Sequence, residues 1–180
     1  MYRKLLFTLS LASLLVISVA GLAMAAPGDV TDADTLKDLA MVRQVTAKYH
    51  DVNAALEDGF VSTIECAEEP GLGAMGIHYV HFGRILDPGL DPAAPEALLY
   101  MPSADGPRLV GVEYFYAIGG PDAPIPNPAP PAPSLFGRTF DGPMPGHDVG
   151  QPPHYDLHVW LWQANPSGMF APWNSSLSCP

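Results

Sequence analysis

The order of the apolar patterns along the chain constrains its fold more than any other feature. Residues 31–58 carry apolar side chains at spacings of three and four, which is typical of an amphipathic helix. Four later segments, 75–82, 97–101, 109–117 and 155–162, are rich in aromatic and β-branched residues and are bounded by Gly, Pro and Asp. One helix followed by strands predicts an α+β fold, in which an N-terminal helix packs on an antiparallel sheet of about four strands.

The first 25 residues have the composition of an export signal. Arg3 and Lys4 precede a long apolar run, and the triplet at 23–25, AMA, fits the A-x-A cleavage pattern. We therefore expect residues 1–25 to be a cleaved signal peptide and residues 26–180 to form a single globular domain, secreted or periplasmic. No later segment is apolar and long enough to span a bilayer, so no membrane association is expected after cleavage.

The charge and the cysteines narrow the class of protein further. Cleavage removes two basic residues and takes the formal net charge from −11 to −13, which argues against nucleic acid as a partner. Cys66 and Cys179 have no second Cys or His at metal-ligand spacing. In an oxidising compartment they are expected to form one structural disulfide bond. The oligomeric state is not predicted.

Residues 119–153 are the least regular part of the sequence. They contain eleven prolines, and extended Pro-rich chain does not form the interior of a sheet. Leu135, Phe136 and Phe140 interrupt the prolines. We expect one long Pro-rich loop that packs back over the sheet through these three side chains and covers a site there.

Polar side chains recur on the predicted strands in phase with one another. Because strand side chains alternate between faces, His158 is expected to share a face with Asp156. Strict alternation also groups Glu113 with Leu109 and sets Val110 on the opposite face. Glu113 lies in the middle of an apolar strand, where a buried carboxylate needs a partner.

These phases predict a metal site on one face of the sheet. His78, Glu113 and His158 are expected to project from neighbouring strands, and two imidazoles with a carboxylate suit a divalent zinc, copper or iron ion. His154 is the expected fourth ligand. Further candidate ligands are His147 and Asp156. The alternative is a buried Glu–His pair that fixes strand register and holds no metal.

Three long stretches also carry a resemblance to other proteins. GAMGIHYVH, LVGVEYFY and LHVWLWQANPSGMFAPWN together resemble a family of small exported bacterial proteins, over most of the chain after residue 25. A shorter stretch, ALLYMPSADGPRLVGVEYFY, is similar to a segment of the oil-body-associated protein family. Neither resemblance supplies catalytic residues, but together they imply a folded, exported bacterial domain.

Three functions remain open from the sequence. The first is an exported protein that binds a divalent metal through its His and Glu side chains. The second is a small-molecule binding domain, in which Trp160, Trp162 and Phe115 line an apolar pocket and the histidines are structural. The third is a metal-dependent enzyme with an open coordination position. No nucleophile, oxyanion hole or organic-cofactor motif is recognised, so no catalytic residue is named.

Overall fold

The computed structural model describes residues 32–147 and 149–180, and the expected signal peptide, residues 1–25, lies outside this part. The described chain begins with three helical segments, α1 (Ala33–Thr46), η1 (Ala47–His50) and α2 (Val52–Glu57). Asp32 begins α1, because its carboxylate accepts a hydrogen bond from the Thr35 N–H at 2.8 Å. Asp51 begins α2 in the same way, accepting from the Asn53 N–H at 2.9 Å. The helix predicted for residues 31–58 is therefore divided, since a second capping Asp starts α2.

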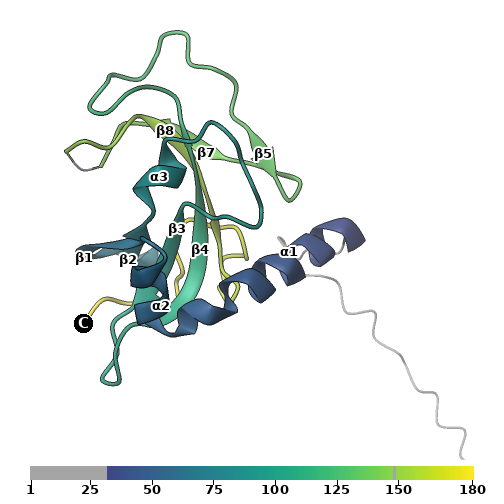
Figure 1. The fold of residues 1–180 in the computed structure, drawn as a ribbon, viewed down its shortest axis with the longest axis vertical. Helices are drawn as coiled ribbons and strands as arrows, with labels where there is room; N and C mark the ends of the chain where they lie inside the picture. Colours follow the sequence, from purple (N-terminus) through teal and green to yellow (C-terminus); the bar gives the residue numbers. More distant parts are fainter. Residues whose placement is uncertain (1–31, 148) are drawn as a thin grey trace, which may run out of the picture.

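Six strands of the described chain form one antiparallel sheet (Figure 1). Across the sheet their order is β1 (Val61–Glu69), β2 (Gly73–Val80), β3 (Ala97–Met101), β4 (Arg108–Ala117), β8 (His154–Val159) and β7 (Asp141–Met144). The four central strands correspond to the four segments predicted from the sequence. The prediction of about four strands was too low, because both edge strands lack the aromatic and β-branched pattern of the centre.

The N-terminal segments α1, η1 and α2 cover one face of this sheet (Figure 1). Leu39 and Val42 of α1 and Tyr49 of η1 pack in one buried cluster with Tyr100 and Tyr114 of the sheet. The Tyr100 hydroxyl donates a hydrogen bond to the Tyr49 carbonyl oxygen at 2.6 Å, which joins helix and sheet through a buried polar contact. The predicted packing of an N-terminal helix on an antiparallel sheet is confirmed.

The Pro-rich segment packs on this same helix-covered face. It contains a small hairpin, β5 (Ser134–Leu135) with β6 (Arg138–Thr139), and then supplies edge strand β7. Phe136 and Phe140 are buried in the helix-side core, and the Phe136 ring meets the Tyr114 ring edge-on at 5.4 Å. Leu135 packs against the same core. The segment is therefore not one continuous loop: it packs over the sheet through Leu135, Phe136 and Phe140 as expected, but these side chains lie on the helix-covered face.

A bulge in β4 changes which side chains reach each face. Leu99 pairs with Gly111, but the next residue, Tyr100, pairs with Leu109, so Val110 is an extra residue. Leu109 joins the helix-side core, whereas Val110 packs with Leu99 on the opposite face. The predicted faces of Leu109 and Val110 were therefore wrong. Glu113 follows the bulge and keeps the phase expected for it.

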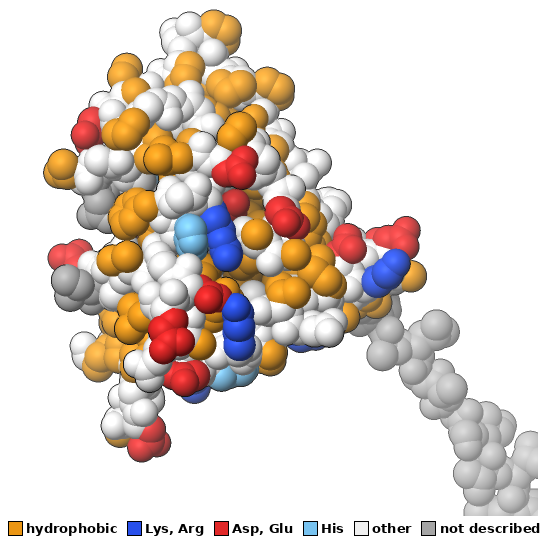
Figure 2. Space-filling model, viewed as in Figure 1, with side chains coloured by type: hydrophobic (Ala, Val, Ile, Leu, Met, Phe, Trp, Pro, Cys, Tyr) orange, Lys and Arg blue, Asp and Glu red, His pale blue; other side chains and the backbone are white. Residues whose placement is uncertain are grey.

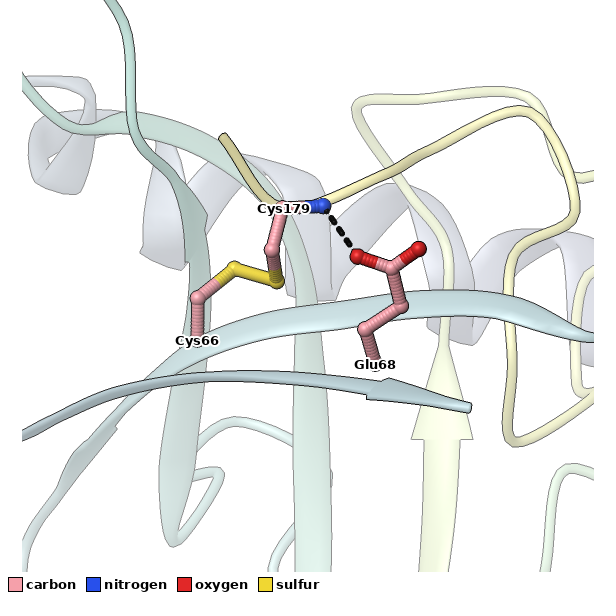
Figure 3. The surroundings of a disulfide bond; sticks show 3 residues. All are labelled: Cys66, Glu68 and Cys179. Atoms are coloured by element: carbon pink, nitrogen blue, oxygen red, sulfur yellow. Dashed lines mark hydrogen bonds between the residues drawn. A yellow bond between two sulfur atoms is a disulfide. The ribbon is translucent and has the colours of Figure 1, made fainter. Parts of the chain in front are cut away.

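The disulfide between Cys66 and Cys179 ties the C-terminal tail to β1 (Figure 3). The two Cα atoms lie 5.9 Å apart, and the bond joins residues separated by 113 positions. Beside it, the Glu68 carboxylate accepts a hydrogen bond from the Cys179 N–H at 2.7 Å. The predicted disulfide is confirmed. Closing a loop of this length stabilises the fold by about 4–5 kcal/mol if chain entropy alone is counted.

The surface carries acidic side chains spread among apolar ones, as Figure 2 shows for one side of the molecule. They do not gather into one continuous acidic patch on that side. Between residues 32 and 180, leaving out Asp148, we find no helix with the length and apolar character needed to cross a membrane.

Candidate metal centre

Strands β2, β4 and β8 bring His78, Glu113 and His158 together on one face of the sheet. Glu113 in β4 pairs directly with His158 in β8, so their side chains leave the sheet side by side on one face. His78 comes from β2, on the far side of β3. On β3, Glu113 pairs with Ala97 and His78 pairs with Leu99, so His78 and Glu113 approach each other diagonally across that strand. We call this the histidine face; it is the face that α1 does not cover.

The three side chains lie at distances suited to a shared ligand. One potential ligand atom from each of them lies within 4.8 Å of the others. His78 Nε2 is 3.4 Å from Glu113 Oε2. The rings of His78 and His158 are perpendicular, with centroids 6.0 Å apart. An ion about 2.0–2.2 Å from each nitrogen or oxygen would need these donor atoms to move together by only a small amount.

Glu113 and His158 are buried, and burial favours the neutral form of both side chains. Burial raises the pKa of Glu113 well above its ordinary value, and the nearby Asp156 and Glu96 carboxylates raise it further. Burial lowers the pKa of His158 to about 3, and the neighbouring His78 adds to that effect. His158 therefore stays neutral at physiological pH and keeps a lone pair for a metal. No Lys or Arg among the described residues forms an ion pair with Glu113.

His158 is the member of the cluster with unmet hydrogen-bonding groups. Both of its ring nitrogens are buried and have no hydrogen-bond partner within the described part of the chain. The Asp156 Oδ1 atom, on the same face, is also buried and has no hydrogen-bond partner among the described residues. Leaving a buried polar group unpaired costs roughly 1–3 kcal/mol, so this arrangement calls for an explanation. A bound cation would satisfy one His158 nitrogen together with Glu113 and His78.

Access to the cluster is from the His78 side. The His78 side chain is 18% exposed, compared with 9% for Glu113 and 1% for His158. An ion would therefore meet His78 first, and the two buried ligands would hold it from beneath. A site with three protein ligands and one accessible side leaves a coordination position for water.

His154, the expected fourth ligand, lies apart from these three residues. It is buried on the same face, but its ring stacks on Phe115 at a centroid distance of 4.0 Å. Its Nδ1 is 3.0 Å from the Pro152 carbonyl oxygen, and its ring meets that of His147 at 5.1 Å. Burial lowers its pKa to about 4. His154 does not belong to the group of three ligand atoms, so the four-ligand set is not assembled.

The three aromatic residues expected to line one pocket belong to three separate clusters. Trp160 packs near the disulfide, and its Nε1–H donates to the Ala171 carbonyl at 2.6 Å. Trp162 lies beyond the end of β8 and meets the His50 ring edge-on at 4.4 Å. Phe115 packs with residues around α3 (Phe82–Ile85). A hollow of about 240 Å³ lies elsewhere, bordered by Arg138 and the segment 167–171.

Sequence reasoning missed the buried acid Glu96. Its carboxylate accepts a hydrogen bond from the Phe115 N–H at 3.0 Å, and burial raises its pKa to about 7. Glu96 precedes β3 rather than lying within the apolar run, so the alternation gave no signal for it. Asp156 was considered from its phase with His158, and the structure places it next to that ring, with 3.8 Å between Oδ1 and Nδ1.

Comparisons with protein-family models, with curated proteins and with solved structures find no match for this chain. The resemblance to small exported bacterial proteins therefore stays a prediction.

Proposed function

We propose that this protein is an exported binding protein for a divalent transition-metal ion, held by His78, Glu113 and His158. The observation that carries the proposal is His158, whose two ring nitrogens are buried and have no hydrogen-bond partner among the described residues, beside a buried carboxylate and a second imidazole. Two neutral imidazoles and one carboxylate form a ligand set that suits zinc, copper and iron. An ionised Glu113 would also supply negative charge next to the cation.

The metal-free alternative accounts for less of this arrangement. A protonated Glu113 that donates to His78 would satisfy the carboxyl group and one imidazole nitrogen, over the observed 3.4 Å. It would leave both His158 nitrogens unpaired. A register-fixing pair has no need of a third polar residue at 1% exposure, whereas a metal site does.

Export is supported by two further observations. A disulfide between Cys66 and Cys179 persists in an oxidising compartment, and residues 1–25 have the pattern of a signal peptide. The alternative of an apolar pocket has less support, since the three aromatic residues assigned to it lie in separate clusters.

Metal content measured on purified protein tests the proposal. Protein stripped with EDTA is equilibrated in turn with Zn²⁺, Cu²⁺ or Fe²⁺, desalted and analysed by mass spectrometry for the element. We expect about one equivalent of at least one ion in the wild type, because the site has one set of three ligands. The isosteric variant Glu113→Gln is expected to lose it, since an amide is a poor ligand for these ions.

The matched control is His50→Ala, which removes an exposed imidazole on the helix side and leaves the histidine face intact. This variant is expected to bind as the wild type does. Circular dichroism of each variant shows whether it is folded. A wild type that retains none of the three ions, or equal binding by wild type and Glu113→Gln, would overturn the proposal.

A further inference from the structure

A buried carboxylate lies beside the most deeply buried ligand of the proposed metal site. Asp156 Oδ1 is 3.8 Å from His158 Nδ1, and neither atom has a hydrogen-bond partner among the described residues. We infer that Asp156 is a positioning residue: it accepts a hydrogen bond from the His158 Nδ1–H in the metal-bound protein, which leaves Nε2 as the ligating nitrogen. The inference rests on the proposed metal site and adds the group that orients its central ligand.

The strand geometry supports this pairing. Asp156 and His158 are two positions apart on β8, so both side chains leave the same face and lie next to each other. On the neighbouring strands Asp156 pairs with Phe115 and with Asp141, and neither is a cation that would hold its carboxylate elsewhere. The basic side chain recorded beside its carboxylate is His158, at 3.8 Å.

Asp156 is better placed to orient His158 than to bind the metal itself. The group of atoms that lie within 4.8 Å of one another contains His78, Glu113 and His158, and does not extend to Asp156. An imidazole that faces a carboxylate through Nδ1 presents Nε2 on the opposite side of the ring. Carboxylates in this position fix the ring orientation and the tautomer and make the ligating nitrogen more basic.

The hydrogen bond requires Asp156 and His158 to move slightly closer together. A distance of 3.8 Å is too long for a hydrogen bond, whose donor and acceptor usually lie about 2.9–3.0 Å apart. Closing the difference takes a movement of roughly 0.8–0.9 Å, which a small rotation of either side chain provides. His154 shows the same arrangement already closed, with its Nδ1 3.0 Å from the Pro152 carbonyl oxygen.

Zinc binding by Asp156 variants tests the inference. Zn²⁺ affinity is measured by competition with a chromophoric chelator for the wild type, Asp156→Ala and Asp156→Asn. Asp156→Ala is expected to weaken binding about 10–100-fold, the usual effect of removing such a partner. Asp156→Asn keeps an oxygen acceptor and is expected to recover most of the loss. Asp105→Ala, which removes an exposed acid between β3 and β4, is the control for charge and should bind as the wild type does.

A second readout separates orientation from stability. Two-bond ¹H–¹⁵N correlation spectra of the zinc-loaded protein report which imidazole nitrogen of His158 carries the proton. We expect Nδ1–H with zinc on Nε2 in the wild type and a mixture of tautomers in Asp156→Ala. Zinc on Nδ1 in the wild type would overturn the inference, even if Asp156→Ala fails to fold.

The outcomes also separate this inference from the proposed function. Tight zinc binding that is unchanged in Asp156→Ala, with the same tautomer, would refute the role of Asp156 and leave the metal site standing. A wild type that binds none of the tested ions would overturn both.

Discussion

Substituting Glu113 by Gln should make the metal-free protein less sensitive to pH. In the folded protein burial and the charges of Asp156 and Glu96 raise the pKa of Glu113, so it keeps its proton well above the pH at which an unfolded chain loses it. An exposed Glu titrates near pH 4.3. Above that pH the unfolded state has released a proton that the folded state still holds. The free energy of unfolding therefore falls as the pH rises toward the folded pKa.

The size of the effect follows from proton linkage. Each pH unit in this window removes up to about 1.4 kcal/mol from the stability of the wild type. Gln cannot ionise, so Glu113→Gln lacks this pH-dependent loss of stability and serves as the reference. Between pH 5 and pH 7 the wild type should lose up to about 2.7 kcal/mol relative to the variant. Groups far from Glu113 titrate alike in both proteins and largely cancel in the difference, whereas Asp156, whose pKa burial raises to about 7, adds its own pH dependence near pH 7.

The assay is urea unfolding followed by tryptophan fluorescence, at pH 5, 6 and 7 with EDTA present. The quantity compared is the free energy of unfolding of wild type minus that of Glu113→Gln. With saturating zinc the trend should reverse, because the cation binds ionised Glu113 and stabilises the folded state more as the pH rises. A difference that stays constant between pH 5 and pH 7 without metal would refute the assignment of Glu113 as a buried, protonated acid.

Three further predictions test other parts of the structure. Replacing Cys66 and Cys179 together by Ser should lower the free energy of unfolding by about 2–5 kcal/mol, measured in urea, and dithiothreitol should then have no further effect. Phe136→Ala should cost about 3–5 kcal/mol of stability and leave zinc affinity unchanged, since its ring lies on the helix-covered face; a large loss of affinity would contradict that placement. Ala97→Leu should weaken zinc binding at least about 10-fold in a chelator competition, because Ala97 pairs with Glu113 and the added atoms would crowd its carboxylate; unchanged affinity would show that the space beside Glu113 is not needed.

The central strands could be predicted from the sequence, and the edges of the sheet could not. β2, β3, β4 and β8 are buried and rich in aromatic and β-branched residues, which makes their pattern visible. β1 includes the acidic stretch around Cys66, and β7 contains Gly142 and Pro143. Edge strands tolerate such residues because one side of their backbone needs no partner.

The candidate site could be predicted in part, from the phase of side chains on each strand. Glu113 and His158 were correctly placed on one face, because the two residues pair directly and no bulge interrupts the pairing of β4 with β8. The extra residue Val110 could not be predicted, because a bulge depends on the pairing partner as well as on the local sequence. His154 shares the phase of His158, but its ring orientation is set by the Pro152 carbonyl and by Phe115. Those contacts depend on how the chain enters β8.

The sequence also could not predict on which face of the sheet the apolar side chains of the Pro-rich segment pack. Leu135, Phe136 and Phe140 are apolar and can pack on either side of a sheet. They lie beside Tyr114 because the helix-covered face offers a larger apolar surface. The histidine face holds buried acids and imidazoles at its centre. Covering these polar groups with aromatic rings is less favourable than covering an apolar surface.

The disulfide has a consequence for how the protein withstands cleavage. Strands β2, β3, β4, β7 and β8 all lie between Cys66 and Cys179 in the sequence, so the bond encloses them in one covalent loop. A protease that cuts once within this loop, for example in the exposed turn at Asp105, produces new ends and no separate fragment. The two pieces stay joined, and the strands that carry His78, Glu113 and His158 remain tethered at high effective concentration until the disulfide is reduced.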